Sequence, residues 1–414
     1  MTLPDPDAAR RALTELLRSS GRDVLATLTR WTGDLALAED AVQDATLRAL
    51  EVWPRDGVPE NPVAWLRLTA RRRAVDLVRR EATRRPKEAA AMNGVLSALG
   101  GEGEDELGPS AIDDDLLRLV FTCCHPSLAL DTQVALALRT LCGLTTEEVA
   151  RALLVSEAAM AKRLTRARQK IKQARIPYRV PPDHELPNRW AAVLATAYLL
   201  FNEGYAATTG ADLVRAGLVD EARRLSRLLR RLQPDDPGAL GLLALMLLQD
   251  SRRATRVDVS GATVLLRHQD RERWDRAAIE EAVPLVGEGL RRTPERPDRY
   301  VVQAAIAACH ALAPSWAETD WGAVVSWYDV LLALDAGPVV RLNRAAAVAE
   351  LDGAEAGLAL IDEIDGLESY ALWHASRAVL LRRLGRPLEA SAAERRAADL
   401  PLNDPQRALL GTVI

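Results

Sequence analysis

The residues from Gly143 to Ile171, GLTTEEVARALLVSEAAMAKRLTRARQKI, decide the fold of the chain. They predict two helices joined by a short turn, the first over about 146–153, with Ser156 placed to cap the second by accepting from a free backbone N–H. The second helix has an apolar stripe at positions i, i+4, i+7 and i+11, formed by Met160, Leu164, Ala167 and Ile171. This stripe predicts one buried helix face.

The opposite face of the second helix is basic. A helix-turn-helix places the N-terminal part of its second helix in the major groove of DNA, where basic side chains reach bases and phosphates. The pattern therefore predicts a DNA-binding surface made of Ser156, Glu157, Ala159, Lys162, Arg163, Arg166 and Lys170. The same residues also fit another interpretation, a solvated basic face in an ordinary helical bundle.

Nearly all of the 414 residues read as helix, because alanine, leucine, arginine and glutamate dominate and alternating β-branched runs are scarce. The content of 48% hydrophobic and 27% charged residues is typical of a soluble protein with a sizeable core. No apolar run reaches the roughly 18 residues of a membrane helix, and the first residues lack the apolar core of a signal peptide. We therefore expect a cytoplasmic protein without a membrane partner.

The net charge of −4 is a sum over unlike segments. Residues 65–87 and 161–175 are strongly basic, whereas residues 101–115 are acidic. The acidic and glycine-rich composition of 84–112 predicts a flexible linker, and four prolines in 176–187 predict a second, stiffer one. These linkers divide the chain into helical domains over 8–83, 113–175 and 188–414.

The last of these domains shows helical hairpins at roughly 34-residue spacing. In the clearest one, over 368–405, Ala375, Ala390 and Ala397 allow two helices to approach, and the residues at 384–386 make the turn. Weaker copies lie over 327–364 and 219–248. The hairpins resemble degenerate tetratricopeptide (TPR) repeats, and the alternative is an ordinary helical bundle.

Two adjacent cysteines, Cys123 and Cys124, lie in FTCCHPSL at the predicted join between two helices. Adjacent side chains on a helix point about 100° apart and are poorly placed to share one metal. Free cysteine is also among the most buried residue types, so we expect packing here and neither a metal site nor a cofactor. A redox role that includes Cys142 stays open. Only four cysteines in the chain fit a reducing compartment.

The run 143–171 is similar to region 4 of extracytoplasmic-function-type bacterial sigma factors, whose usual sequence is close to GLSYEEIAEILGISVGTVKSRLHRAR. The two sequences align without a gap. The matches are Gly143, Leu144, Glu147, Glu148, Ala150, Leu153, Ser156, Arg163, Leu164, Arg166, Ala167 and Arg168. In one departure Leu154 replaces the glycine of the turn, which predicts a somewhat different turn shape. The resemblance implies that this domain reads the −35 element of a promoter.

Two earlier stretches resemble region 2 of the same family. In DLALAEDAVQDATLRALEVW (34–53), an apolar stripe of Leu35, Ala38, Val42, Ala45 and Ala49 is expected to pack inside. The resemblance implies that the outward face docks on core RNA polymerase through Asp40, Gln43, Asp44, Leu47 and Arg48. In NPVAWLRLTARRRAVDLVRRE (61–81), it implies −10 recognition by Asn61, Trp65, Arg71, Arg72, Asp76, Arg79 and Arg80.

The second of these stretches departs from the family pattern at two positions. Arg67 replaces an expected aromatic residue and Arg72 an expected asparagine. Both changes weaken base-specific reading and strengthen contact with phosphates. The preceding segment 52–61 is expected to form a loop at the place where family members hold a base flipped out of the promoter strand.

Three motifs in the family order identify the chain as a member of the sigma-factor subgroup with a TPR-like C-terminal extension. The implied fold is all-α, with a region 2 bundle, a region 4 helix-turn-helix and a C-terminal helical array. The implied function is promoter-specific initiation with core RNA polymerase and promoter DNA as partners, and without catalysis by this chain. A small YCII-related protein is a further implied partner, because such proteins are often encoded beside members of the subgroup. The extension is expected to regulate or support activity.

Two rival functions remain open on the sequence. One is an enzyme or ligand-binding groove at FNEGYAATTG (201–210), with Asn202, Glu203 and Tyr205 as its polar residues. The alternative to such a site is that Asn202 to Tyr205 form a helix end, whose buried polar residues hydrogen-bond between helical hairpins. The other rival is a helix-turn-helix regulator with a TPR-like sensor domain that binds duplex DNA without polymerase. The region 2 motif discriminates against that regulator, because its docking face would have no purpose there.

Overall fold

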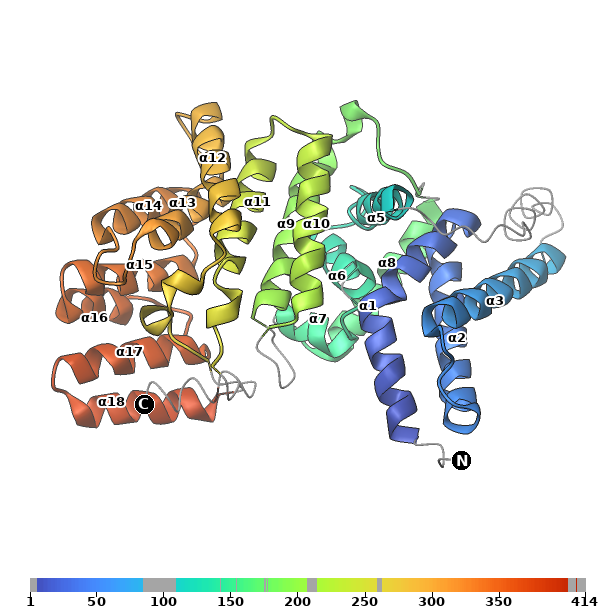
Figure 1. Cartoon of the computed structure of the whole chain (residues 1–414), viewed down its shortest axis with the longest axis horizontal. Coiled ribbons are helices and arrows are strands. Elements are labelled where there is room, and N and C mark those ends of the chain that lie inside the picture. The colour runs from blue at the N-terminus through green and yellow to red at the C-terminus, as the bar shows by residue number, and fades with distance from the viewer. Residues whose placement is uncertain are drawn as a thin grey trace. The chain divides into compact units, whose positions relative to one another are not determined.

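The computed structural model describes residues 6–84, 109–141, 143–153, 155–174, 176, 178–206, 214–258, 263–400 and 407. The regular elements of these residues are all helices, and no strand is present among them apart from an isolated antiparallel bridge between Val257 and Thr263. The predicted all-α fold class is confirmed. The chain divides into two compact units, residues 1–200 and 201–414. The boundary falls inside one helix, α9 (Pro187–Tyr205) (Figure 1).

The first unit begins with α1 (Pro6–Thr32), α2 (Leu35–Asp56) and α3 (Pro62–Arg84), which pack on one another. Asp34 starts α2 by accepting from the backbone N–H groups of Ala36 and Leu37, at 2.9 and 3.2 Å. The inner face of α2 is lined by the buried residues Leu35, Ala38, Ala41, Ala45, Ala49 and Trp53. The predicted stripe was wrong at Val42, which is half-buried, because its neighbour Ala41 faces the core instead.

The expected loop over 52–61 is shorter in the structure. Helix α2 continues through Pro54 to Asp56 and ends at Gly57, whose φ of 86° suits glycine. The last turn stays helical because Trp53 is 2% exposed and packs edge-on against Trp65 of α3, with ring centroids 5.4 Å apart. The connection that precedes α3 is therefore limited to residues 57–61.

The rest of the first unit contains α5 (Pro109–Cys123), α6 (Leu130–Leu141), α7 (Thr146–Ala152), α8 (Glu157–Ala174), the 3-10 turn η2 (Asp183–Glu185) and the first part of α9. The predicted linker 84–112 differs at its ends, because Arg84 closes α3 and residues 109–112 already belong to α5. The remainder of that linker, and the turn residue Leu154, lie outside the described residues.

The second unit is an array of helices joined by short turns. In chain order its elements are α10 (Ala216–Leu232), α11 (Pro237–Asp250), η3 (Arg253–Thr255), η4 (Leu266–His268), η5 (Arg271–Arg273), α12 (Arg276–Arg292), α13 (Arg299–Leu312), α14 (Trp321–Leu334), α15 (Pro338–Leu351), α16 (Ala354–Asp362), α17 (Ala371–Arg383) and α18 (Pro387–Asp399). Four of these helices, α11 to α14, are capped by aspartate side chains that accept backbone N–H groups: Asp236, Asp275, Asp298 and Asp320.

Helix α11 is apolar on all sides because it lies between neighbours. Almost all of its residues are buried, and it packs against both α12 and α13. Gly241 permits the close approach to α13, since a Cβ at this position would lie 2.3 Å from the backbone nitrogen of Val301. A side chain at residue 241 would therefore separate the two helices.

Helical hairpins form where the sequence predicts them, with α10 and α11, α15 and α16, and α17 and α18 as packed pairs (Figure 1). In the last pair, Gly385 makes the turn with a φ of 68°, and Ala375 and Ala397 are buried together. The resemblance of these hairpins to TPR repeats stays a prediction. Between α11 and α12, residues 251–275 interrupt the array with short 3-10 turns. No sequence motif marks this segment.

Candidate functional site

Helices α7 and α8 form the predicted helix-turn-helix. Helix α7 begins with a reciprocal cap, in which Thr145 N–H donates to Glu148 Oε2 at 2.7 Å and Glu148 N–H donates to Thr145 Oγ1 at 3.1 Å. Helix α8 begins with the predicted cap, because Ser156 Oγ accepts from Ala159 N–H at 3.4 Å. Local sequence therefore fixes both helix starts.

Helix α8 presents its two faces as the pattern predicts. The apolar stripe is buried, with 7% exposure or less at Met160, Leu164, Ala167 and Ile171. On the other side Lys162, Arg166 and Lys170 are exposed and Arg163 is half-buried. The residues Ser156, Glu157 and Ala159 at the start of the helix are also exposed. Among the described residues no carboxylate pairs with these four cations, so their charge is available to an anionic partner.

One arginine of α8 has a different role that the sequence analysis missed. Arg168 Nε donates to Glu39 of α2, and Glu39 also accepts from Thr140 of α6 at 3.4 Å. Within the first unit, these bonds tie the helix-turn-helix to the first helical group. The spacing along one helix shows which face a residue occupies, but it carries no information on a partner 129 residues away.

A second joint in the first unit surrounds Asp115 of α5, which is 1% exposed. Arg30 of α1 and Arg118 both pair with this carboxylate, at 3.2 and 2.8 Å. Tyr178 Oη lies 3.0 Å from the carbonyl of Ala26 and 2.9 Å from that of Asp115. Burial raises the pKa of Tyr178, so the hydroxyl keeps its proton and can donate.

The predicted docking face on α2 is mostly exposed, with one exception. Asp40, Gln43, Leu47 and Arg48 are exposed as expected. Asp44, in contrast, is half-buried and accepts from Arg73 of α3 at 2.8 Å. The expectation that Asp44 faces outwards needs this correction, because its carboxylate helps to join α2 to α3.

The predicted −10 residues of α3 do not share one environment. Asn61 caps the helix by accepting from Ala64 N–H at 3.0 Å, and Trp65 is half-buried against Trp53. Arg71 lies over the ring of Trp31 at 5.3 Å. The other members of the set are exposed together on the helix: Arg72, Asp76, Arg79 and Arg80.

The cysteine pair at the end of α5 is packing, as predicted. Cys123 and Cys124 are both 0% exposed, and the Cys124 Sγ lies 3.5 Å from Thr196 Oγ1. Burial raises the pKa of Cys124 to about 12, so the group stays a thiol at neutral pH. Cys142, the third member of the redox hypothesis, lies outside the described residues.

The polar residues at the end of α9 are separated rather than gathered into one site. Glu203 is buried and pairs with Arg215 at 3.4 Å, whereas Tyr205 stacks on Phe201 with centroids 5.4 Å apart. Asn202 is half-buried. Gly204, between these residues, allows close packing, since a Cβ there would lie 2.7 Å from the backbone nitrogen of Val219. Residues 207–210 of the motif lie outside the described residues.

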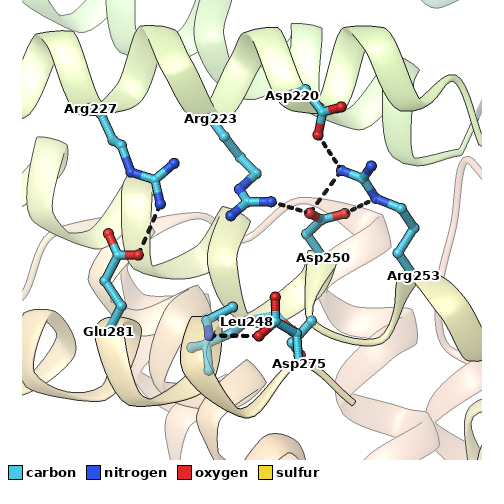
Figure 2. Close-up of polar contacts among 10 residues, drawn as sticks. Asp220, Arg223, Arg227, Leu248, Asp250, Arg253, Asp275 and Glu281 are labelled. Carbon is cyan, nitrogen blue, oxygen red and sulfur yellow. Dashed lines mark hydrogen bonds and ion pairs between the residues drawn. The ribbon is translucent and has the colours of Figure 1, made fainter. Parts of the chain in front are cut away.

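The second unit contains a network of ion pairs that the sequence analysis missed (Figure 2). Asp250, at the end of α11, accepts from Arg223 of α10 at 2.7 Å and from Arg253 at 2.6 Å. Arg253 also reaches Asp220 at 2.7 Å. We call these four residues the Asp250 network. Its members come from α10, α11 and η3, and their pairing depends on tertiary contact between elements.

Comparison with known families agrees with this arrangement. Residues 16–84 match the model of Sigma-70 region 2, and residues 118–171 match Sigma-70 region 4. Residues 189–289 match a family of unknown function, DUF6596. An uncharacterized protein of Rhizobium meliloti (strain 1021) is 43% identical over 395 residues, which cover 95% of this chain and 93% of that protein.

Within the described residues, no helix combines the length and the apolar character needed to cross a membrane. The two sigma models match in the order region 2, then region 4. The first covers most of α1 and all of α2 and α3, and the second runs from within α5 to within α8, so it includes the helix-turn-helix. The chain belongs to the sigma-70 family: it is a sigma factor that binds RNA polymerase and promoter DNA.

Proposed function

We propose that the chain directs promoter-specific initiation, with region 2 (8–83) on core polymerase and the −10 element and region 4 (113–175) on the −35 element. The observation that carries this division is the face of α8. It has exposed cations without carboxylate partners among the described residues, opposite a fully buried stripe. Such a face gains most from DNA phosphates and base edges in a major groove.

The docking of region 2 on core polymerase is supported by exposed apolar residues on α2. Leu47 is 53% exposed and Leu50 is 42% exposed, beside the polar residues Gln43 and Arg48. Protein interfaces commonly combine an apolar centre with a polar rim. We therefore assign polymerase docking to Asp40, Gln43, Leu47 and Arg48, and give Asp44 a structural role.

For the melted −10 strand we propose the exposed side of α3, with Arg72, Arg79 and Arg80 following the phosphate backbone. Arg72 stands where the family usually has asparagine. That change favours electrostatic contact over base reading. Trp65 packs against Trp53, and the exposed Asn61 caps the start of α3, so both help to hold this helix in place.

Residues 188–414 are proposed to regulate or support initiation, and the chain itself is proposed to have no catalytic activity. Comparing a truncated chain with the full chain shows whether residues 188–414 raise or lower initiation. Ending it near Ala174 would remove Arg189, which donates to the carbonyl of Phe121 at 3.3 Å, and Thr196, which contacts Cys124. The better end is Leu200, which keeps the first unit whole. A YCII-related partner stays a prediction.

The deciding experiment is transcription in vitro with core polymerase on a cognate promoter. The full chain should make core polymerase initiate at that promoter, and core polymerase alone should not. A duplex-binding regulator would instead bind its operator without polymerase and leave core polymerase inactive. Promoter binding by the chain alone, with no polymerase-dependent transcript, would contradict the proposal.

A further inference from the structure

Three arginines lie in the segment between α11 and α12, outside the two sigma regions of the chain. Arg256 and Arg271 are only 8% and 6% exposed, and Arg252 is half-buried. Buried arginine is normally paired with a carboxylate, because an uncompensated charge away from water is costly. These three side chains depart from that rule.

Arg252 and Arg256 lie against the same aromatic ring. The guanidinium carbon of Arg256 is 3.5 Å from the ring centroid of Tyr205, and that of Arg252 is 5.5 Å away. Arg256 also donates to the carbonyl of Tyr205, and Arg252 donates to Gln249 Oε1 at 2.9 Å. No carboxylate among the described residues forms an ion pair with either side chain.

Arg271 lies in η5, and its positive charge and that of Arg252 both act on His310. It donates to the carbonyls of His310 and Ala313, both at 2.7 Å, and to Thr319 Oγ1 at 3.3 Å. All three acceptors are neutral. Burial first, and then the charges of Arg252 and Arg271, lower the pKa of His310 to about 4, so this imidazole is neutral at neutral pH.

The carboxylates whose charges act on Arg256 and Arg271 are Asp250 and Glu318, and both already have other partners. Asp250 belongs to the Asp250 network and accepts from Arg223 and Arg253 (Figure 2). Glu318 accepts from Ser315 Oγ at 2.7 Å. The cluster thus carries three positive charges without a carboxylate bound to any of them in the described part of the chain.

Two further polar atoms beside these arginines have no hydrogen-bond partner although they are buried. They are the hydroxyl of Tyr205 and Nδ1 of His310. Each can donate a hydrogen bond to an oxyanion, provided that the neutral imidazole carries its proton on Nδ1. Other buried polar atoms in the described residues also lack a partner, but these two lie beside arginines that no carboxylate neutralises.

We propose that Arg252, Arg256, Arg271, Tyr205 and His310 form a binding site for a small ligand with an oxyanion group, a phosphate or a carboxylate. Guanidinium groups match the planar oxygen pairs of both anions. Arg256 and Arg271 form the inner wall, held by neutral acceptors. Arg252, Tyr205 and His310 are half-buried, although the Tyr205 hydroxyl and His310 Nδ1 are themselves buried. The site would let the second unit respond to a metabolite.

Isothermal titration calorimetry on the full chain tests the site, with sodium phosphate in one arm and sodium succinate in the other at constant ionic strength. Arg252→Gln is the main variant, because this half-buried side chain is the one least needed for folding. We expect it to lower the affinity about tenfold, the effect of one charge-assisted bidentate contact. Tyr205→Phe, which removes only the hydroxyl, should lower it by a smaller factor.

Arg267→Gln is the matched control. Arg267 also lies over an aromatic ring, that of Trp316 at 5.3 Å, but it is paired with Glu350. Glu350 keeps a second partner, Arg383, when Arg267 is removed. The site is supported if a probe binds saturably, Arg252→Gln weakens that binding and Arg267→Gln preserves it. The probe that binds more tightly then shows whether the ligand is a phosphate or a carboxylate. Binding of neither probe, or equal loss in both arginine variants, overturns it.

Discussion

Helices α8 and α10 share a basic, amphipathic pattern but have different surroundings. Both have an apolar face that is buried. On α8, Lys162 and Lys170 have no carboxylate partner among the described residues. On α10, Arg223 and Arg227 pair with Asp250 and Glu281, at 2.7 and 2.9 Å. A basic helix face therefore indicates DNA binding only when its charges are left unpaired by the rest of the fold.

The difference also explains why two interpretations of the α8 pattern were open on the sequence. The pattern allowed a DNA-reading face or a structural basic face, and the chain contains an example of each. Helix α10 is the structural one, because its cations hold neighbouring helices. The family match and the free cations together separate the two cases.

The largest expected effect is the loss of stability on breaking the ion pairs between α10 and Asp250. Asp250→Asn leaves Arg223 and Arg253 without their buried counterion and should destabilise the second unit by about 3–5 kcal/mol. Urea denaturation of the full chain measures this as an earlier transition. Asp220→Asn is the control, because its carboxylate is 60% exposed and its loss should change stability by less than about 1 kcal/mol. Equal effects of the two variants would show that burial of Asp250 is unimportant.

A second effect concerns exposed apolar residues rather than charges. Leu47→Asp should weaken binding to core polymerase by about 2 kcal/mol, as expected for a residue at the centre of an interface. Leu388→Asp is the matched control, since Leu388 is 86% exposed but lies on α18, far from the docking face in sequence. The two variants are compared by measuring their affinity for core polymerase immobilised on a surface. Unchanged affinity for Leu47→Asp would remove α2 as the docking surface.

A smaller effect separates two arginines on α8 itself. Arg168 pairs with Glu39, so Arg168→Ala should destabilise the first unit by about 1 kcal/mol, the scale of a partly exposed ion pair. Arg166→Ala should leave stability unchanged, because within the described part of the chain Arg166 bonds only to the carbonyl of Lys162. It should instead reduce the salt dependence of promoter binding by the holoenzyme, by about one in the log–log slope. The reverse pattern would contradict the assignment of the two side chains.

The smallest effect at neutral pH concerns Cys124. Its thiol has an ordinary pKa of 9.0 when unfolded and about 12 when buried. A folded-state pKa above the unfolded value means that this contribution to stability is complete below pH 9 and is lost between pH 9 and 12. Cys124→Ala should therefore make the fall of the free energy of unfolding between pH 9 and 12 less steep. Near pH 7 it should not change how that free energy depends on pH. Rapid thiol labelling of the native chain at pH 8 would contradict the buried assignment.

Local features of the fold were predictable from the sequence. The cap at Ser156, the stripe from Met160 to Ile171 and the turn at Gly385 follow from helix periodicity and backbone preference over a few residues. Pairings across the chain were not predictable. Glu39 with Arg168, or Asp44 with Arg73, depends on which helices pack together, and no spacing rule encodes that.

The same limit applied to residues 251–275. A run with arginine, aspartate and glutamine looks like an ordinary polar connection, and only the fold brings Arg252 and Arg256 over the ring of Tyr205. FNEGYAATTG was singled out for its polar residues, and Tyr205 does belong to the proposed site. Its companions there come from positions between about 50 and about 100 residues later in the chain.

The central claim is that the unpaired cations of α8 serve promoter recognition, and transcription in vitro with core polymerase tests it most directly. The variant is Lys162→Ala with Arg166→Ala, and Arg224→Ala on α10 is the control, because Arg224 pairs with Glu221 at 2.7 Å. The double variant should lose most promoter-specific initiation while a pull-down retains full core polymerase, and the control should keep both. Full initiation by the double variant would contradict the claim.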